Sequence, residues 1–201
     1  SWPAVEDVIS AVASVQPQTL VVAIAPGAIL TDWRDKVPAI LCVFLPGEQF
    51  GNALADVLFG ETPPQGKLPL TFPNVDNEQG MTAEQWPGVP STEFPGSKHV
   101  VYAEKQMNGY RWYDKHGVAP AFAFGHGLSY GGNATYSGLR VEGRRVSFQV
   151  KVPSGGCDTP QVYVGYPGGG EDVPTKVLRG FEKICGGGAR GRTRTATVAL
   201  V

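Results

Sequence analysis

The sequence predicts an α/β fold in its N-terminal part and an all-β sandwich in its C-terminal part, both incomplete. In the first part, two apolar runs with β-branched residues lie between segments of helical periodicity, which is typical of a parallel sheet. In the last part, short runs with a period of two are separated by Gly-rich turns, which is typical of an antiparallel sandwich. With Gly 27 and Pro 17 among 201 residues, a helical bundle or coiled coil is excluded.

The first helix and two strands follow from periodicity and from the residues that end them. Apolar residues recur at three- and four-residue spacing over 5–15, and Pro17 ends this predicted helix. The runs 20–25 and 39–45 are almost continuously apolar, so we expect parallel strands that are buried on both faces.

A second helix is predicted over 52–59, closed by Gly60 at the position where helices often end in a left-handed residue. Two strands make a very small sheet with an open edge. We therefore expect the sheet to be completed by upstream sequence or by a partner. The absence of a leader pattern after Ser1 likewise suggests a processed, truncated or partial chain.

The segment 61–130 is predicted to be a long covering loop. Its first forty residues are rich in Pro, Gly and polar side chains and show no sustained period. Aromatic residues such as Phe72, Trp86 and Phe94 suggest that it packs on another surface. From residue 131 to residue 201 we count about five alternating strands, fewer than the seven of an immunoglobulin-type sandwich.

Composition excludes several function classes. Lys+Arg 17 against Asp+Glu 18 argues against a nucleic-acid partner, and no run is long enough for a membrane span. The three cysteines have no metal spacing and no cofactor motif follows a strand, so we expect neither metal nor cofactor. Cys157 and Cys185 lie in Gly-rich loops, where they form a disulfide or remain free thiols.

Several motifs have a spacing that composition does not explain. They are Leu45-Pro46-Gly47 with 51–60, 64–69 and 71–73, then Gly109–Asp114, then Phe122–Tyr130. In this order they closely resemble the C-terminal half of glycoside hydrolase family 3 enzymes, and most of all the β-glucosidases. The run 177–183 resembles the fibronectin type III-like domain that follows in many of them. The resemblance implies a partial α/β-sandwich domain over 1–130 and a partial fibronectin type III-like domain over 131–201.

The resemblance also implies a function. Such enzymes are exo-acting retaining β-glucosidases, which use two carboxyl groups about 5 Å apart to remove terminal glucose from β-glucosides or cello-oligosaccharides. Their nucleophilic Asp lies in an N-terminal barrel, and their acid/base Glu lies upstream of the helix that begins this chain. Neither matches a position here, so no catalytic residue is expected in this chain and the barrel is its missing partner. We expect the whole protein to be secreted or extracellular, or periplasmic if the source is bacterial.

Four residues are candidates for a place near the substrate: Glu104, Tyr110, Arg111 and Trp112. Glu104 could act in a sugar site, or it could form a structural ion pair with Arg111 or a surface lysine. Arg111 could meet a sugar hydroxyl or an aromatic face, or anchor the long loop. Relatives usually have Glu-Gly where this chain has Glu104-Lys105, which removes a flexible backbone position.

Asn133 begins an N-glycosylation triplet that ends at Thr135, which matters only for a protein secreted by a eukaryotic pathway. The alternative to an enzyme part is a non-catalytic carbohydrate-binding or interaction module. A third hypothesis is that the chain is a fragment without independent activity.

Overall fold

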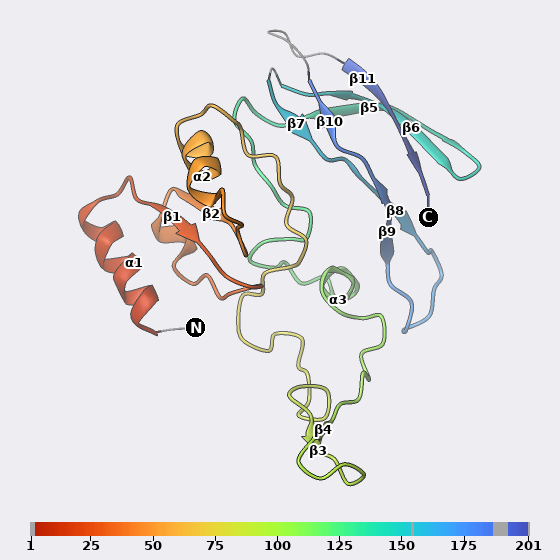
Figure 1. Cartoon of the computed structure of the whole chain (residues 1–201). Helices are drawn as coiled ribbons and strands as arrows, with labels where there is room; N and C mark the ends of the chain where they lie inside the picture. Colours follow the sequence, from red (N-terminus) through yellow and green to blue (C-terminus); the bar gives the residue numbers. More distant parts are fainter. Residues whose placement is uncertain (1–2, 154, 187–192, 201) are drawn as a thin grey trace. The chain divides into compact units, whose positions relative to one another are not determined.

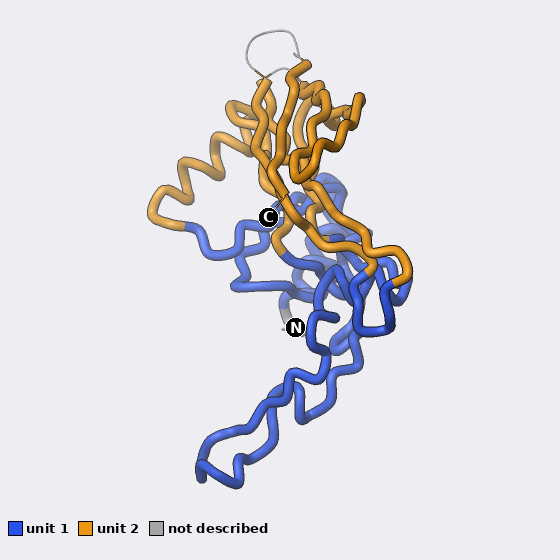
Figure 2. The backbone as a smooth tube through the Cα atoms, turned by 90° about the vertical axis from the view of Figure 1, so that its right-hand side faces the viewer, with its two compact units in different colours: residues 1–46, 70–123, 169–174 blue, residues 47–69, 124–168, 175–201 orange. Residues whose placement is uncertain are grey.

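The computed structural model, drawn with its helices and strands in Figure 1, describes residues 3–153, 155–186 and 193–200. The chain divides into two compact units, which Figure 2 shows in blue and orange. Unit 1 consists of Ser1–Pro46, Leu70–Ala123 and Gly169–Pro174, and unit 2 consists of Gly47–Pro69, Phe124–Gly168 and Thr175–Val201. The units are thus interleaved along the sequence, and the expected domain boundary between residues 130 and 131 stays a prediction.

Unit 1 contains the predicted helix and parallel strands. Its elements are α1 (Pro3–Val15), β1 (Leu20–Ala23), the 3-10 helix η1 (Arg34–Lys36), β2 (Ala39–Cys42), β3 (Val89–Pro90), β4 (Lys98–His99) and α3 (Tyr110–His116). Strands β1 and β2 pair in parallel, from Leu20 opposite Ala39 to Ala23 opposite Cys42. The two apolar runs therefore form parallel neighbours, as predicted.

The expectation that these two strands are buried on both faces is wrong for the described residues. Each strand begins with an exposed residue and continues with half-buried ones. The small core of unit 1 is made by Ala13, Trp33 and Val37, which pack with parts of α1, β1 and β2. Because β1 and β2 pair only with each other in the described part of the chain, the outer edge of each strand has no strand partner there.

The segment 70–123 holds more regular structure than the predicted loop. The short antiparallel pair β3–β4 forms a hairpin, and Phe72 bridges to Phe122 with the two rings 6.0 Å apart and perpendicular. Helix α3 is bracketed by Gly109 and Gly117, both with positive φ, and the Gly117 amide donates to the Tyr113 carbonyl. These bracketing glycines are the sequence signal that the loop prediction overlooked.

Unit 2 contains α2 and the antiparallel strands. Its elements are α2 (Phe50–Leu58), β5 (Thr135–Glu142), β6 (Arg145–Lys151), β7 (Cys157–Asp158), β8 (Gln161–Gly165), β9 (Lys176–Phe181), β10 (Ile184–Cys185) and β11 (Thr193–Ala199). Helix α2 ends before Gly60, which has φ 82°, as predicted. The strands form one sheet in the order β11-β6-β5 and the pairs β8–β9 and β7–β10.

The inner face of β6 carries the core of unit 2. Val146, Phe148 and Val150 alternate with exposed or half-buried residues, so the period-two pattern gives the strand one dry face. They pack with four other buried residues: Val152, Ile184, Ala196 and Val198. The five predicted runs all lie on strands, but the short strands β7 and β10 were not predicted. Cys157 and Cys185 therefore lie opposite each other on strands rather than in loops, and they form a disulfide.

Candidate functional site

Two of the sequence motifs meet inside unit 2. The Leu68 amide donates to the His126 carbonyl at 2.8 Å, and the Gly125 amide donates to the Leu68 carbonyl at 2.8 Å. At Gly127 a Cβ atom would lie 2.3 Å from the carbonyl oxygen of Gly66, so the close approach of the two segments requires glycine there. The motifs 64–69 and 122–130 are thus joined by backbone contacts that a side chain would prevent.

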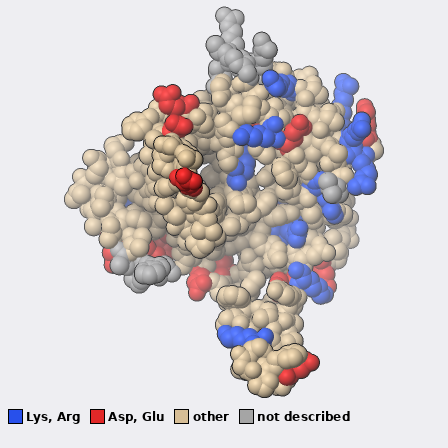
Figure 3. Space-filling model, in the orientation of Figure 1, with Lys and Arg blue, Asp and Glu red and all other residues tan. Residues whose placement is uncertain are grey.

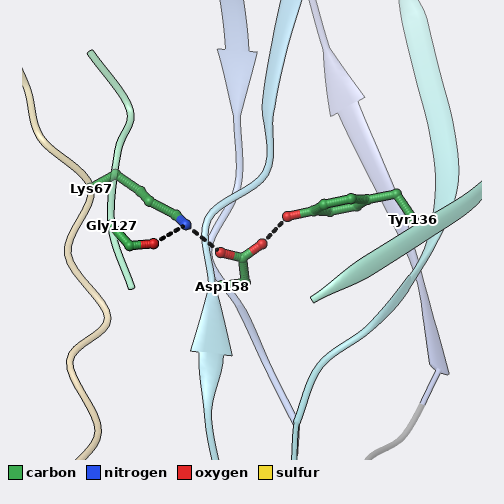
Figure 4. Close-up of polar contacts among 4 residues, drawn as sticks. All are labelled: Lys67, Gly127, Tyr136 and Asp158. Atoms are coloured by element: carbon green, nitrogen blue, oxygen red, sulfur yellow. Dashed lines mark hydrogen bonds and ion pairs between the residues drawn. The ribbon is translucent and has the colours of Figure 1, made fainter. Parts of the chain in front are cut away.

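Lys67 extends this pairing to the β-strands. Its Nζ atom lies 2.9 Å from Oδ1 of Asp158 and donates to the carbonyl of Gly127 at 3.2 Å (Figure 4). The Tyr136 hydroxyl donates to the other carboxylate oxygen of Asp158. Lys67, Gly127, Tyr136 and Asp158 are called the motif junction below. They connect both motifs to β5 and β7.

Asp158 is the charged centre of the motif junction. Asp158 is only 8% exposed, and the side chain of Lys67 is 24% exposed. A buried carboxylate is costly unless a cation and hydrogen-bond donors compensate it, and Lys67 and Tyr136 provide both. The arrangement therefore explains why a lysine, a tyrosine and an aspartate from distant parts of the chain converge.

A pocket of about 340 Å³ lies beside the motif junction. It is lined by the segment Gly125–Ser129, by Lys67, Tyr136 and Asp158 of the junction, and by Cys157 of the disulfide. Asp158 is the one carboxylate among these lining residues. Because hydrolysis of a glycosidic bond uses two carboxyl groups, this pocket lacks the pair that the reaction needs.

The residues predicted to lie near substrate are all in unit 1. Oε2 of Glu104 accepts a hydrogen bond from the amide of Gln85 at 2.8 Å, so its described partner is an amide and not Arg111 or a lysine. The Arg111 guanidinium lies 5.6 Å from the centre of the Tyr110 ring, which is one of the expected alternatives. Trp112 stacks on His116 of the same helix.

A polar centre around Tyr113 was not predicted from the sequence. This residue is 3% exposed, and its hydroxyl donates to Oε2 of Glu78 at 2.6 Å. The backbone and side-chain amides of Asn74 also donate to Glu78, each at 2.9 Å. Burial raises the pKa of Glu78, but these hydrogen bonds outweigh it and hold the pKa below its usual value. Burial and the neighbouring Glu78 raise the pKa of Tyr113.

This centre ties α3 to the rest of unit 1. The side chain of Asn74 donates to the carbonyl of Ala119 and accepts from Arg34 next to β2. Tyr113 is the buried residue of α3, whereas its neighbours Tyr110, Arg111 and Trp112 are half-buried.

Asn133 lies exposed in the turn that precedes β5 and lines the pocket at the motif junction. Within the described ranges, no three His, Cys, Asp or Glu side chains are grouped so that they could hold a metal ion. A helix of the length and apolarity needed to cross a membrane is likewise not found there.

Comparisons with known proteins agree on one family. The model of the glycosyl hydrolase family 3 C-terminal domain matches residues 1–130. A β-glucosidase of Rhizobium radiobacter is 37% identical over 97% of this chain and 24% of its own length. Thermostable β-glucosidase B of Acetivibrio thermocellus is 39% identical over 88% of this chain and 23% of its own length.

Solved structures give the same result. DesR, a β-glucosidase from Streptomyces venezuelae in complex with D-glucose, matches 98% of this chain and 25% of its own with a TM-score of 0.84 and 33% identity. β-Glucosidase 3B from Thermotoga neapolitana matches 97% of this chain and 28% of its own with a TM-score of 0.82 and 33% identity. The chain thus spans about a quarter of the length of these relatives.

Proposed function

The chain belongs to glycosyl hydrolase family 3, and from this premise we propose that it forms the C-terminal part of an exo-acting, retaining β-glucosidase. The whole enzyme would remove terminal β-D-glucosyl residues from oligosaccharides, such as cello-oligosaccharides, or from glucosides. The observation that carries this proposal is the identity of 37% to a β-glucosidase over 97% of the chain. In a retaining mechanism one carboxylate forms a glycosyl-enzyme intermediate, and a second carboxyl group acts first as acid and then as base.

We place both of these carboxyl groups outside the present chain. The strongest internal candidate, Glu104, is engaged with Gln85. The pKa of Glu78 is lowered, whereas a general acid needs a raised one. The carboxylate of Asp158 is engaged with Lys67 and Tyr136. These three assignments support a chain that surrounds an active site without supplying its acid or its nucleophile.

Each part of the chain has a role in this proposal. The elements β1, β2 and α1 would belong to an α/β domain that borders the active-site cleft. The segment 61–130 would cover the interface with an N-terminal barrel, and it carries side chains that need such a cover: Trp86, Phe94 and Tyr102 are 72%, 63% and 76% exposed. The strands from 131 to 201 would be a fibronectin type III-like brace.

We also propose that the protein works outside the cytoplasm. The disulfide between Cys157 and Cys185 supports a secreted, extracellular or periplasmic location, because such bonds persist in oxidising compartments. Exposed Asn133 would be accessible to N-glycosylation if the source uses a eukaryotic secretory pathway.

The exposed aromatic residues of the segment 61–130 favour one other function, a non-catalytic carbohydrate-binding or interaction module. Aromatic rings offer flat apolar faces, and a sugar ring can lie against them by its C–H groups. In this alternative the aromatic side chains would bind sugar directly, and no barrel would cover them.

Activity of the longer protein and of the 201-residue chain on an aryl β-glucoside tests the proposal. We expect turnover by the longer protein, with the β-anomer as the first product in a proton NMR time course, and no turnover by the chain alone. Turnover by the chain alone would place a carboxyl pair within it. Binding of cello-oligosaccharide without turnover by either protein would support the binding module instead.

A further inference from the structure

The disulfide lies directly beside the charged centre of the motif junction. Cys157 precedes Asp158 on β7, and the ladder that joins β7 to β10 consists of Cys157 opposite Cys185 and Asp158 opposite Ile184. Two backbone hydrogen bonds flank this short ladder, from the Gly186 amide to the Gly156 carbonyl at 2.9 Å and from the Glu182 amide to the Pro160 carbonyl at 3.4 Å. The covalent bond adds to these few contacts in fixing β7, and with it the backbone position from which the Asp158 side chain extends.

The bond can be reached from solvent while the carboxylate beside it is buried. Cys185 is exposed, Cys157 is half-buried and Asp158 is buried. A thiolate from a dithiol can attack the Cys185 sulfur, which breaks the S–S bond, forms a mixed disulfide and releases Cys157 as a thiolate. The second thiol of the reagent then displaces Cys185. The protein gains two electrons and two protons, and the dithiol becomes a cyclic disulfide.

We propose that the Cys157–Cys185 disulfide is a redox lock on the motif junction. Its reduction by a dithiol frees β7 from β10, moves Asp158 away from Lys67 and Tyr136, and loosens the pairing of the segments 64–69 and 122–130. Lys67 is bonded to Gly127 as well as to Asp158, so a displaced carboxylate also weakens the hold of Lys67 on the second motif.

The sheet β11-β6-β5 has its own means of staying folded after reduction. Its long ladders run from Thr193 opposite Lys151 to Ala199 opposite Arg145, and its inner face packs Val146, Phe148 and Val150. Ile184 of β10 packs into this same core, so we expect β10 to stay with the sheet and β7 to be the strand that reduction releases. This inference does not depend on which reaction the longer protein catalyses.

Hydrogen exchange of the intact protein, with and without dithiothreitol, tests the lock. The reporter amides are those of Leu68 and Gly125, because their hydrogen bonds join the two motifs. We expect reduction to speed their exchange about tenfold or more, the effect of losing a charge-assisted contact. The amides of Val146 and Val150 on β6 should keep their protection. A Cys42→Ser variant removes the free thiol and should respond like the parent protein.

Asp158→Asn separates the lock from a general staple. This variant should raise the exchange of the Leu68 and Gly125 amides while the disulfide is intact, and reduction should then add little. The proposal is overturned if thiol titration shows the bond open while both reporters stay protected, or if Asp158→Asn retains the full response to dithiothreitol. Loss of protection on β6 together with the reporters would show a staple for all of unit 2, which also overturns it.

Discussion

The two units differ in how well they bury the apolar residues that the sequence gives them. In unit 2, Phe148 and Val150 on β6 are 7% and 0% exposed. In unit 1, the apolar stripe of α1 includes Val8 and Val12, which are 60% and 44% exposed. The difference shows that a periodic apolar pattern does not by itself bury the residues that form it. Strand β6 has a neighbour on each side, whereas β1 and β2 pair with each other alone in the described residues.

The units also differ in charge. The three segments of unit 2 contain eleven Lys and Arg against six Asp and Glu, and those of unit 1 contain six against twelve. Figure 3 shows Lys and Arg atoms gathered over the strands of unit 2. The formal net charge of -1 for the whole chain therefore conceals two units of opposite sign.

The largest effect should come from the core of unit 2. Phe148→Ala removes a buried aromatic ring from the inner face of β6, and we expect it to lower the free energy of unfolding by about 3–5 kcal/mol. Chemical denaturation followed by circular dichroism measures the change.

Val8→Ala in α1 is the matched test in unit 1. Because Val8 is exposed, we expect a change within about 0.5 kcal/mol in the 201-residue chain. A larger loss in the longer protein would reveal that another part of it covers the helix there. An equal loss of stability for Val8→Ala and Phe148→Ala in the chain alone would contradict the difference in burial between the units.

Lys67→Met should have the next largest effect. It leaves Asp158 buried without its cation, and we expect a loss of about 2 kcal/mol, below the value for a fully buried pair because Lys67 is partly exposed. Lys105→Met breaks the Lys105–Asp172 pair, whose side chains are 62% and 70% exposed, and should change stability little. Equal melting shifts in the two variants would contradict this account.

Lys105→Gly should stabilise unit 1 by about 1 kcal/mol. Lys105 has φ 52°, a left-handed conformation that glycine adopts without strain. Lys105→Met loses the same ion pair but keeps the strain, so the difference in stability between these two variants measures the relieved strain less the greater unfolded-chain entropy of glycine. A lower stability for Lys105→Gly than for Lys105→Met would show that the backbone position is unstrained.

The stability of unit 1 should depend on pH through Glu78. Its pKa is lower in the folded chain, so its contribution is present above the ordinary pKa of a glutamate and is lost as the pH falls through the lowered value. Tyr113→Phe removes one of the hydrogen bonds that lower it. We expect the pKa of Glu78, followed by carbon NMR of its carboxyl group, to rise in this variant. An unchanged titration would mean that the Tyr113 contact contributes nothing.

The smallest effect is expected from Glu104→Gln in the longer protein. The described partner of the Glu104 carboxylate is the side-chain amide of Gln85. We therefore expect kcat/KM on an aryl β-glucoside to change less than about twofold. Loss of a general acid or base would instead reduce the rate by roughly 10²–10⁴. A reduction of that size would show that Glu104 is a catalytic residue.

Local signals predicted most of the regular elements. Pro17 and Gly60 marked the ends of α1 and α2, and the alternating runs marked the longer strands of unit 2. Strands β7 and β10 could not be predicted in this way, because two residues are too few to show a period. Helix α3 was missed for a different reason, because the glycines that bracket it were not recognised as helix ends.

Side-chain partnerships were much harder to predict. Arg111 or a surface lysine was the structural partner predicted for Glu104, yet Glu104 accepts from Gln85; Arg111 lies over the Tyr110 ring, one of its predicted alternatives. The glycine at 127 is required by its close approach to Gly66, which is sixty-one residues away in the sequence. Such contacts depend on where distant segments are brought together.

The sequence by itself determined the family, the parallel pair in unit 1 and the alternating strands of unit 2, because motif order, terminators and hydrophobic period are properties of neighbouring residues. Only the tertiary structure decided that Lys67 meets Asp158, that Cys157 faces Cys185 and that Tyr113 is the buried residue of its motif. Burial and charge pairing act through space, over separations along the chain that no local pattern records.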